Sequence, residues 1–319
     1  MATDKIGDSS ARSFPDYLVL AVKGFCMGAS DVVPGVSGGT MAFILGIYEE
    51  LIEAIKSFDF KSLKLLVTLK LRSFLDRFAW PFLMSVGIGI LTAIFSLATG
   101  LSWLLQNRPV FIWSFFLGLI LASVLSVSRR VEVWRLSTWF SLMGGIIGIY
   151  FFVGLVPVST PNEPWFLFLA GALAICAMIL PGISGSFILV LLGKYRFVLE
   201  AVSQRDFSTL FLVALGACVG IIFFSRLLSW LFKRYHDLTV ALLTGLMLGS
   251  LRKIWPWKET LKSITDTEGR VIPLIQGNVL PSQWDMDAMA AICLMAAGFL
   301  MVFLLDHLAS KKSKRLENL

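Results

Sequence analysis

Apolar residues in this chain form long runs separated by short polar segments. In the first half, three runs cover about residues 80–104, 109–127 and 137–157. In the second half, three more cover about 208–232, 237–251 and 286–307. A helix needs about 20 apolar residues to cross roughly 30 Å of hydrocarbon. The pattern therefore predicts three transmembrane helices in each half.

Each set of three runs follows an apolar stretch that is interrupted by Pro and Gly. The first stretch covers about residues 17–55 and the second about 165–202. The interrupting residues are Pro34, Gly35, Pro181 and Gly182. Pro removes a backbone donor and Gly permits positive φ, so a helix ends at such a point. Each stretch predicts a broken helical hairpin, and both a re-entrant and a fully spanning hairpin remain open.

The two interruptions carry nearly the same sequence. Residues 34–48 read PGVSGGTMAFILGIY, and residues 181–195, which lie 147 positions later, read PGISGSFILVLLGKY. We call residues 34–38 and 181–185 the first and second PGxSG loops. An agreement of this length without a gap indicates a duplication. Because three spans follow each hairpin and three is odd, the two copies must lie in opposite orientations.

The predicted fold class is thus an all-α polytopic membrane protein with an inverted-topology repeat. Residues 1–157 form the N-terminal repeat and residues 158–319 the C-terminal repeat, each a broken or re-entrant hairpin plus three transmembrane helices. A mean hydropathy of +0.80, with 57% apolar and only 15% charged residues, agrees with a multi-pass membrane protein.

The net charge of +7 is interpreted as a signal of topology. Lys and Arg are more frequent in the segments that would be cytoplasmic if the N-terminus is inside, among them a basic amphipathic segment at about 56–80. The positive-inside rule therefore favours cytoplasmic N- and C-termini in a bacterial inner membrane. No nucleic-acid-binding motif accompanies the charge, and we expect no nucleic-acid partner.

The PGxSG loops are candidates for anion binding. The first N–H groups of the helix after each loop have no partner within the helix, and serine hydroxyls lie beside them. Two such helix starts brought together would suit a phosphate or carboxylate. The alternative is that the glycines only allow helices to approach closely. The candidate ligand residues are Ser37, Gly38, Gly39, Thr40, Ser184, Gly185 and Ser186.

Three charged residues interrupt apolar stretches, where charge is costly and often functional. Asp31 lies just before the first loop, and the equivalent residue in the second copy is Met178. Asp31 is a candidate to bind a coupling proton or sodium ion. Lys23 and Arg226 are candidates to neutralise the substrate, although Lys23 would equally pair with Asp31. Arg226 would equally extend towards the end of its helix.

Signatures of an enzyme are not found in the sequence. It contains no H-E-x-x-H or Walker sequence, and neither Ser37 nor Ser184 has a histidine near it in the chain. We therefore expect a protein that is not an enzyme, with no cofactor and no metal.

The stretches GFCMGASDVVPGVSGGTMAFILGIYEELI and ILPGISGSFILVLLGKY resemble the PopT-like family of bacterial membrane proteins. The resemblance covers roughly residues 17–308. It implies translocation of undecaprenyl phosphate, the lipid carrier of cell-wall precursors, from the outer to the inner leaflet for recycling. The implied partners are this lipid, the surrounding membrane lipids and, if transport is coupled, a proton or sodium ion.

Two alternative functions remain open at this point. Undecaprenyl pyrophosphate phosphatases of the bacitracin-resistance type carry a similar P-G-x-S-R-S element in inverted hairpins. Here Gly38 and Gly185 stand in place of the arginine, so the group that would stabilise the transition state is missing. The other alternative is an ion-coupled transporter of a small water-soluble anion.

Overall fold

In a computed structural model, the protein is described over residues 12–32, 37–58, 68, 79–155, 157–158, 160–265 and 271–317. The helices of the first half are α1 (Phe14–Asp31), α2 (Gly38–Ile44), α3 (Tyr48–Lys56), α6 (Trp80–Asn107), α7 (Pro109–Ser128) and α8 (Leu136–Val153). Those of the second half are α9 (Pro164–Ile179), α10 (Gly185–Leu191), α11 (Tyr195–Gln204), α12 (Phe207–Arg234), α13 (His236–Ile254) and α14 (Met286–Glu317). Pro34, Gly35 and most of the basic segment 56–80 lie outside the described residues.

Among the described helices, five are long and apolar enough to cross a membrane: α6, α7, α8, α12 and α14. They match five of the six expected spans, and the protein is a multi-pass membrane protein. Large apolar side chains on these helices point outward, with Phe95 84% and Phe223 72% exposed, as contact with lipid requires.

The sixth expected span, at about 237–251, forms α13, which is not among the five. This helix is 19 residues long, but Asp237 lies in its first turn and Arg252 and Lys253 lie in its last. The charges at both ends leave an apolar centre that is shorter than the hydrocarbon thickness. α13 occupies the place of the sixth expected span, and whether it crosses the membrane stays a prediction.

Both hairpins contain one more break than we expected. The stretch after the first PGxSG loop divides into α2 and α3, and the stretch after the second divides into α10 and α11. The breaks lie at Gly46 (φ 70°) and Gly193 (φ 63°), a backbone conformation that favours glycine. These two glycines occupy identical positions in the repeated string, so the sequence already contained the residues that cause the second break.

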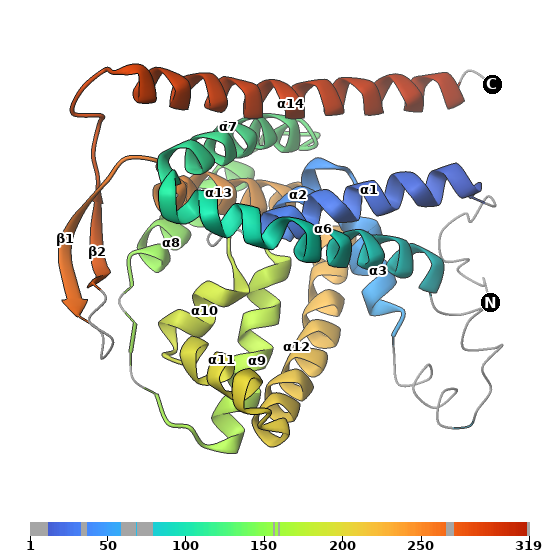
Figure 1. Ribbon diagram of the computed structural model, residues 1–319. Coiled ribbons are helices and arrows are strands. Elements are labelled where there is room, and N and C mark those ends of the chain that lie inside the picture. The colour runs from blue at the N-terminus through green and yellow to red at the C-terminus, as the bar shows by residue number, and fades with distance from the viewer. Residues whose placement is uncertain are drawn as a thin grey trace.

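The expectation of an all-α protein needs one correction. Strands β1 (Lys258–Thr265) and β2 (Val271–Asn278) pair as an antiparallel two-stranded sheet between the spans expected at about 237–251 and 286–307. Irregular register near Lys262 and the proline at position 273 interrupt the alternation that would have indicated strands. The hairpin stands at one edge of the molecule, beside the ends of α8 and α13 (Figure 1).

The helices pack in four main pairs: α1 with α6, α9 with α12, α8 with α13, and α7 with α14. In Figure 1, α7 and α14 run alongside each other across the top, and α9 and α12 run downward from the centre. Glycines lie at each of these contacts and allow the backbones to touch. A Cβ added at Gly145 of α8 would lie 2.5 Å from the Leu242 carbonyl oxygen, and one at Gly245 of α13 would lie 2.2 Å from that of Leu142.

The two halves also meet where α3 packs against α12. Ser229 of α12 donates a hydrogen bond to Glu53 Oε1 (2.5 Å) and accepts one from Lys56 Nζ (2.6 Å). Lys233 Nζ lies 3.4 Å from Glu53 Oε1. In the second half, α11 lies against α12 and α10 of its own half.

We predict that Gly245→Ala lowers the stability of the protein by about 1–3 kcal/mol, because the added methyl group meets the Leu142 carbonyl of α8. Gly144→Ala is the matched control, since a Cβ there meets nothing within 4 Å. The control gains helix propensity, so it should be neutral or slightly stabilising. Thermal unfolding of the detergent-solubilised protein measures both variants, and equal midpoints would contradict the close packing of α8 and α13.

Candidate functional site

The two PGxSG regions lie against each other in the folded protein. The Ser37 hydroxyl reaches the backbone that leads into the second loop, and donates to the carbonyl oxygens of Met178 (2.9 Å) and Leu180 (3.3 Å). The same oxygen accepts the Gly39 N–H at 3.1 Å and so caps α2. Ser37 thus joins the start of α2 to the end of α9.

Thr40 provides a second link, in the opposite direction. Its side-chain oxygen accepts a hydrogen bond of 2.9 Å from the backbone N–H of Gly182, which has φ 89°. Gly39 lies so close to this backbone that an added Cβ would be 2.3 Å from the Ile179 carbonyl oxygen. Both glycines are therefore required by the geometry of the contact.

Asp31 fills the position at the start of α2 where we expected a substrate anion. Its Oδ1 accepts a 2.7 Å hydrogen bond from the Gly38 N–H, and its carboxylate lies beside Gly38. A carboxylate is favourable there because the N-terminus of a helix carries partial positive charge. The second copy has Met178 at this position, so the start of α10 receives no carboxylate from the equivalent residue.

Lys23 lies at the opposite end of α2. Its Nζ donates a 2.8 Å hydrogen bond to the Leu45 carbonyl, and Arg130 donates at 3.2 Å to the Phe43 carbonyl nearby. Cations are favourable at a helix C-terminus. The structure therefore places Lys23 beside the end of α2 and does not bring it to Ser37. Arg130 was not singled out in the sequence, because it lies in a polar turn that is distant from the loops along the chain.

The second loop carries a pair of hydroxyl groups. Ser184 and Ser186 lie 2.7 Å apart, joined by a hydrogen bond between their side chains. Ser184 makes no side-chain cap on α10. Gly185 packs against α9, where an added Cβ would lie 2.6 Å from the Ala174 carbonyl oxygen. This pair is less enclosed than Ser37 and Thr40, because Ser184 is 8% exposed and the other two are fully buried.

Arg226 projects from α12 as an exposed side chain. Among the described residues, no hydrogen bond or ion pair connects it to the PGxSG regions. The described residues also contain no group of three or more His, Cys, Asp or Glu side chains that would hold a metal ion. The expected site residues therefore divide into a central group around the loops and two cations outside it.

Ser37 and Thr40 are joined to residues 178–182 by hydrogen bonds and are fully buried. A phosphate would reach their hydroxyl groups only if these bonds were broken.

Comparison with known proteins identifies the family. Residues 27–272 match the family described as undecaprenyl phosphate translocase-like. The chain belongs to this family. The polyprenyl-phosphate transporter of Vibrio cholerae is 44% identical over 308 residues, which cover 93% of this chain and 98% of that protein. The polyprenyl-phosphate transporter of Staphylococcus aureus is 33% identical over 257 residues, covering 74% and 85% of the two chains. No solved structure matches the chain.

The family is a transporter family, so the expectation that the chain is not an enzyme is confirmed. The resemblance to the PopT-like family is confirmed as well. The comparisons do not test the roles of individual residues, which stay predictions.

We predict that Thr40→Val lowers stability by about 1–3 kcal/mol, because it leaves the buried N–H of Gly182 without an acceptor. Thr40→Ser keeps the hydroxyl oxygen and should lose much less. Thermal unfolding of the purified protein in detergent compares the two variants. A serine variant as unstable as the valine variant would show that the hydrogen bond does not matter.

Proposed function

We propose that this chain translocates undecaprenyl phosphate from the outer to the inner leaflet of the bacterial cytoplasmic membrane, which recycles the lipid carrier. The observation that carries this function is the match to the Vibrio cholerae polyprenyl-phosphate transporter, which extends over 98% of that protein. A phosphate headgroup needs polar ligands within the membrane, and its polyprenyl tail needs an apolar flank. Hydroxyl-bearing loops set among apolar helices supply both.

The two halves are proposed to form an inverted repeat with both termini in the cytoplasm. The packing pairs support it. In the proposed repeat, helices α1, α6, α7 and α8 correspond to α9, α12, α13 and α14. The pair α1–α6 then corresponds to α9–α12, and the pair α7–α14 corresponds to α13–α8. The glycines at these contacts follow the same correspondence, with Gly24 and Gly171 in equivalent positions of α1 and α9. The distribution of Lys and Arg supports the orientation.

The hairpins are proposed to be re-entrant. α2 and α10 each have seven residues, which at 1.5 Å per residue is about 10 Å of helix. This is about a third of the hydrocarbon thickness, so neither helix would complete a crossing. The loops would then lie within the membrane, where transporters often place their substrate sites.

The proposed substrate ligands are the residues of the central group. When the loops separate, the hydroxyls of Ser37, Thr40, Ser184 and Ser186, with the adjoining backbone of Gly38, Gly39 and Gly185, would be free to bind phosphate oxygens. Lys23 and Arg226 would add charge only after a rearrangement, because neither lies at the loops here.

Asp31 is proposed to couple transport to a cation. Its carboxylate holds the Gly38 N–H at the start of α2. Binding of a proton or sodium ion would weaken this hydrogen bond, since a charged acceptor binds an N–H more strongly than a neutral one does. The start of α2 would then be released, and the phosphate would take its place.

We predict that Asp31→Asn separates folding from coupling. Asparagine keeps an oxygen that accepts the Gly38 N–H but does not titrate, so the protein should fold while transport loses its response to an imposed proton or sodium gradient. Asp206→Asn is the matched control, because Asp206 caps the start of α12 and makes no contact with Gly38. Transport in reconstituted vesicles, measured with and without each gradient, tests the coupling. A response equal to that of the wild type would contradict it.

We predict that Ser184→Ala combined with Ser186→Ala slows transport by roughly 10- to 100-fold at low substrate, because two phosphate ligands are lost. Ser203→Ala, an exposed serine on α11, is the control and should leave transport unchanged. The measurement is the outer-leaflet accessibility of undecaprenyl phosphate in vesicles and in cells with and without the protein.

The same vesicles separate the alternative functions. Release of phosphate from polyprenyl pyrophosphate by the purified protein would indicate a phosphatase. Uptake of a small anion without lipid movement would indicate an ion-coupled anion transporter. Either result, or wild-type vesicles that behave as empty ones do, would contradict the proposed function.

A further inference from the structure

A cavity of about 550 Å³ lies at the base of the β hairpin, away from the PGxSG loops. It is enclosed by the first turns of α7, the end of α13 and the two strands, at the edge of the molecule where the hairpin stands (Figure 1). Its walls combine two cations with aromatic and aliphatic side chains. The residues used below are Trp113, Lys253, Trp257, Lys258 and Leu280.

Lys253 and Lys258 both line the cavity, and no carboxylate is among the described residues that line it. No salt bridge to Lys253 or Lys258 is found among the described residues either. Burial, together with the charge of Lys253, lowers the pKa of Lys258 to about 8. Two partly buried like charges are unfavourable unless an anion accompanies them.

Contacts with aromatic rings and one carbonyl hold the lysines in place. Lys258 Nζ lies 5.5 Å from the centre of the Trp113 ring and donates to the Lys253 carbonyl at the end of α13. Lys253 Nζ lies 4.9 Å from the centre of the Phe187 ring on α10. An ammonium has three donors, and the carbonyl uses only one of those of Lys258. The hydrogen bond that caps α13 therefore accounts for only one of the three donors of the Lys258 ammonium.

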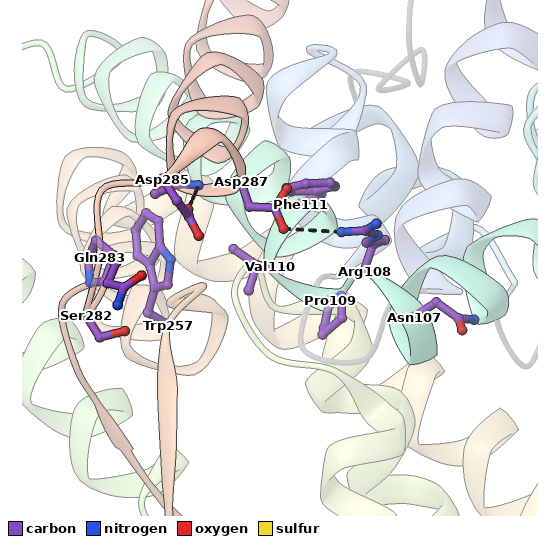
Figure 2. Close-up of a pocket in the computed structure, with 12 residues that line it drawn as sticks. Asn107, Arg108, Pro109, Val110, Phe111, Trp257, Ser282, Gln283, Asp285 and Asp287 are labelled. Atoms are coloured by element: carbon purple, nitrogen blue, oxygen red, sulfur yellow. Dashed lines mark hydrogen bonds and ion pairs between the residues drawn. The ribbon is translucent and has the colours of Figure 1, made fainter.

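A neighbouring cavity of about 300 Å³ differs from the first in its charged residues (Figure 2). It shares Pro109, Val110 and Trp257 with the first cavity, but its charged residues are one arginine and two aspartates instead of two lysines. Arg108 lies 3.2 Å from Asp287, and Asp285 accepts a hydrogen bond from the Ala288 N–H, as the dashed lines in Figure 2 show. The acidic groups of this region are thus engaged on that side, and the Lys253–Lys258 side keeps an excess of positive charge.

Helix α13, whose end lines the cavity, also contacts the second PGxSG loop one turn earlier. A Cβ added at Gly182 would lie 2.9 Å from the Ser250 hydroxyl of α13, and Lys253 follows Ser250 by three residues, or about one helical turn. Phe187, which contacts Lys253, directly follows Ser186. Lys253 thus connects the cavity with α10, the helix that follows the second PGxSG loop.

We infer that the cavity between Lys253 and Lys258 binds the phosphate monoester of an incoming polyprenyl phosphate before the headgroup reaches the PGxSG loops. Lysine binds phosphate as a point charge, and Trp113, Trp257 and Leu280 provide an apolar wall for the first carbon atoms of the tail. This inference rests on the proposed function, and it places the cavity on the outer side in the orientation proposed above.

The test uses the purified full-length protein in detergent. Inorganic phosphate and farnesyl phosphate, a short-chain prenyl monophosphate, are titrated separately by calorimetry at fixed ionic strength. The double variant Lys253→Gln with Lys258→Gln should bind farnesyl phosphate roughly 10- to 100-fold more weakly than the wild type. Arg129→Gln, which removes an exposed cation at the other end of α7, should bind as the wild type does.

The two ligands distinguish the sources of phosphate. Tighter binding of farnesyl phosphate than of inorganic phosphate, lost in the double variant, supports a lipid headgroup site. Equal binding of both ligands, or no loss in the double variant, overturns it.

Vesicle transport distinguishes the inference from the function on which it rests. A double variant that transports more slowly at low lipid concentration but reaches the wild-type rate at high concentration supports capture of the headgroup. A double variant that binds weakly yet transports normally at every concentration overturns the inference and leaves the proposed function intact. Failure of the wild type to transport overturns the proposed function instead.

Discussion

Interrupted helices inside a membrane expose backbone polar groups that lipid cannot satisfy, and this constraint governs the centre of the protein. The two PGxSG regions meet it by binding each other. Ser37 donates to carbonyls before the second loop, and Thr40 accepts the N–H of Gly182 within it. Asp31 satisfies the first N–H of α2. These hydrogen bonds join the start of α2 in the first half to residues 178–182 in the second half.

The sequence predicts the outline of this arrangement for clear physical reasons. Pro181 and Gly182 cannot continue a helix, and a helix ends before them in the structure. Five of the expected spans form helices that are long and apolar enough to cross a membrane. Length and apolarity can both be read from the sequence. The repeated string also indicated that the two loops correspond, which is the basis for looking for contact between Ser37 and the second copy.

Other features depend on contacts that are distant along the chain. Lys23 is near Asp31 in sequence, yet it binds the Leu45 carbonyl, because α2 folds back beside α1. The β hairpin was missed because its strands are stabilised by pairing with each other, and the irregular register near Lys262 hides the alternation of a regular strand. Lys253 and Lys258 looked like ordinary charges in a polar loop, and only the folded hairpin places them around a cavity with Trp113.

The contact between α3 and α12 makes the two halves differ from each other in one respect. Glu53 of the first half accepts a hydrogen bond from Ser229 of the second half. Helix α11, in contrast, packs against helices of its own half. The chain keeps Glu200 where the repeat places Glu53, and Ser102 where it places Ser229. Under the proposed repeat, Glu200 and Ser102 are the residues from which an equivalent contact between α11 and α6 would be built if the two halves exchanged roles.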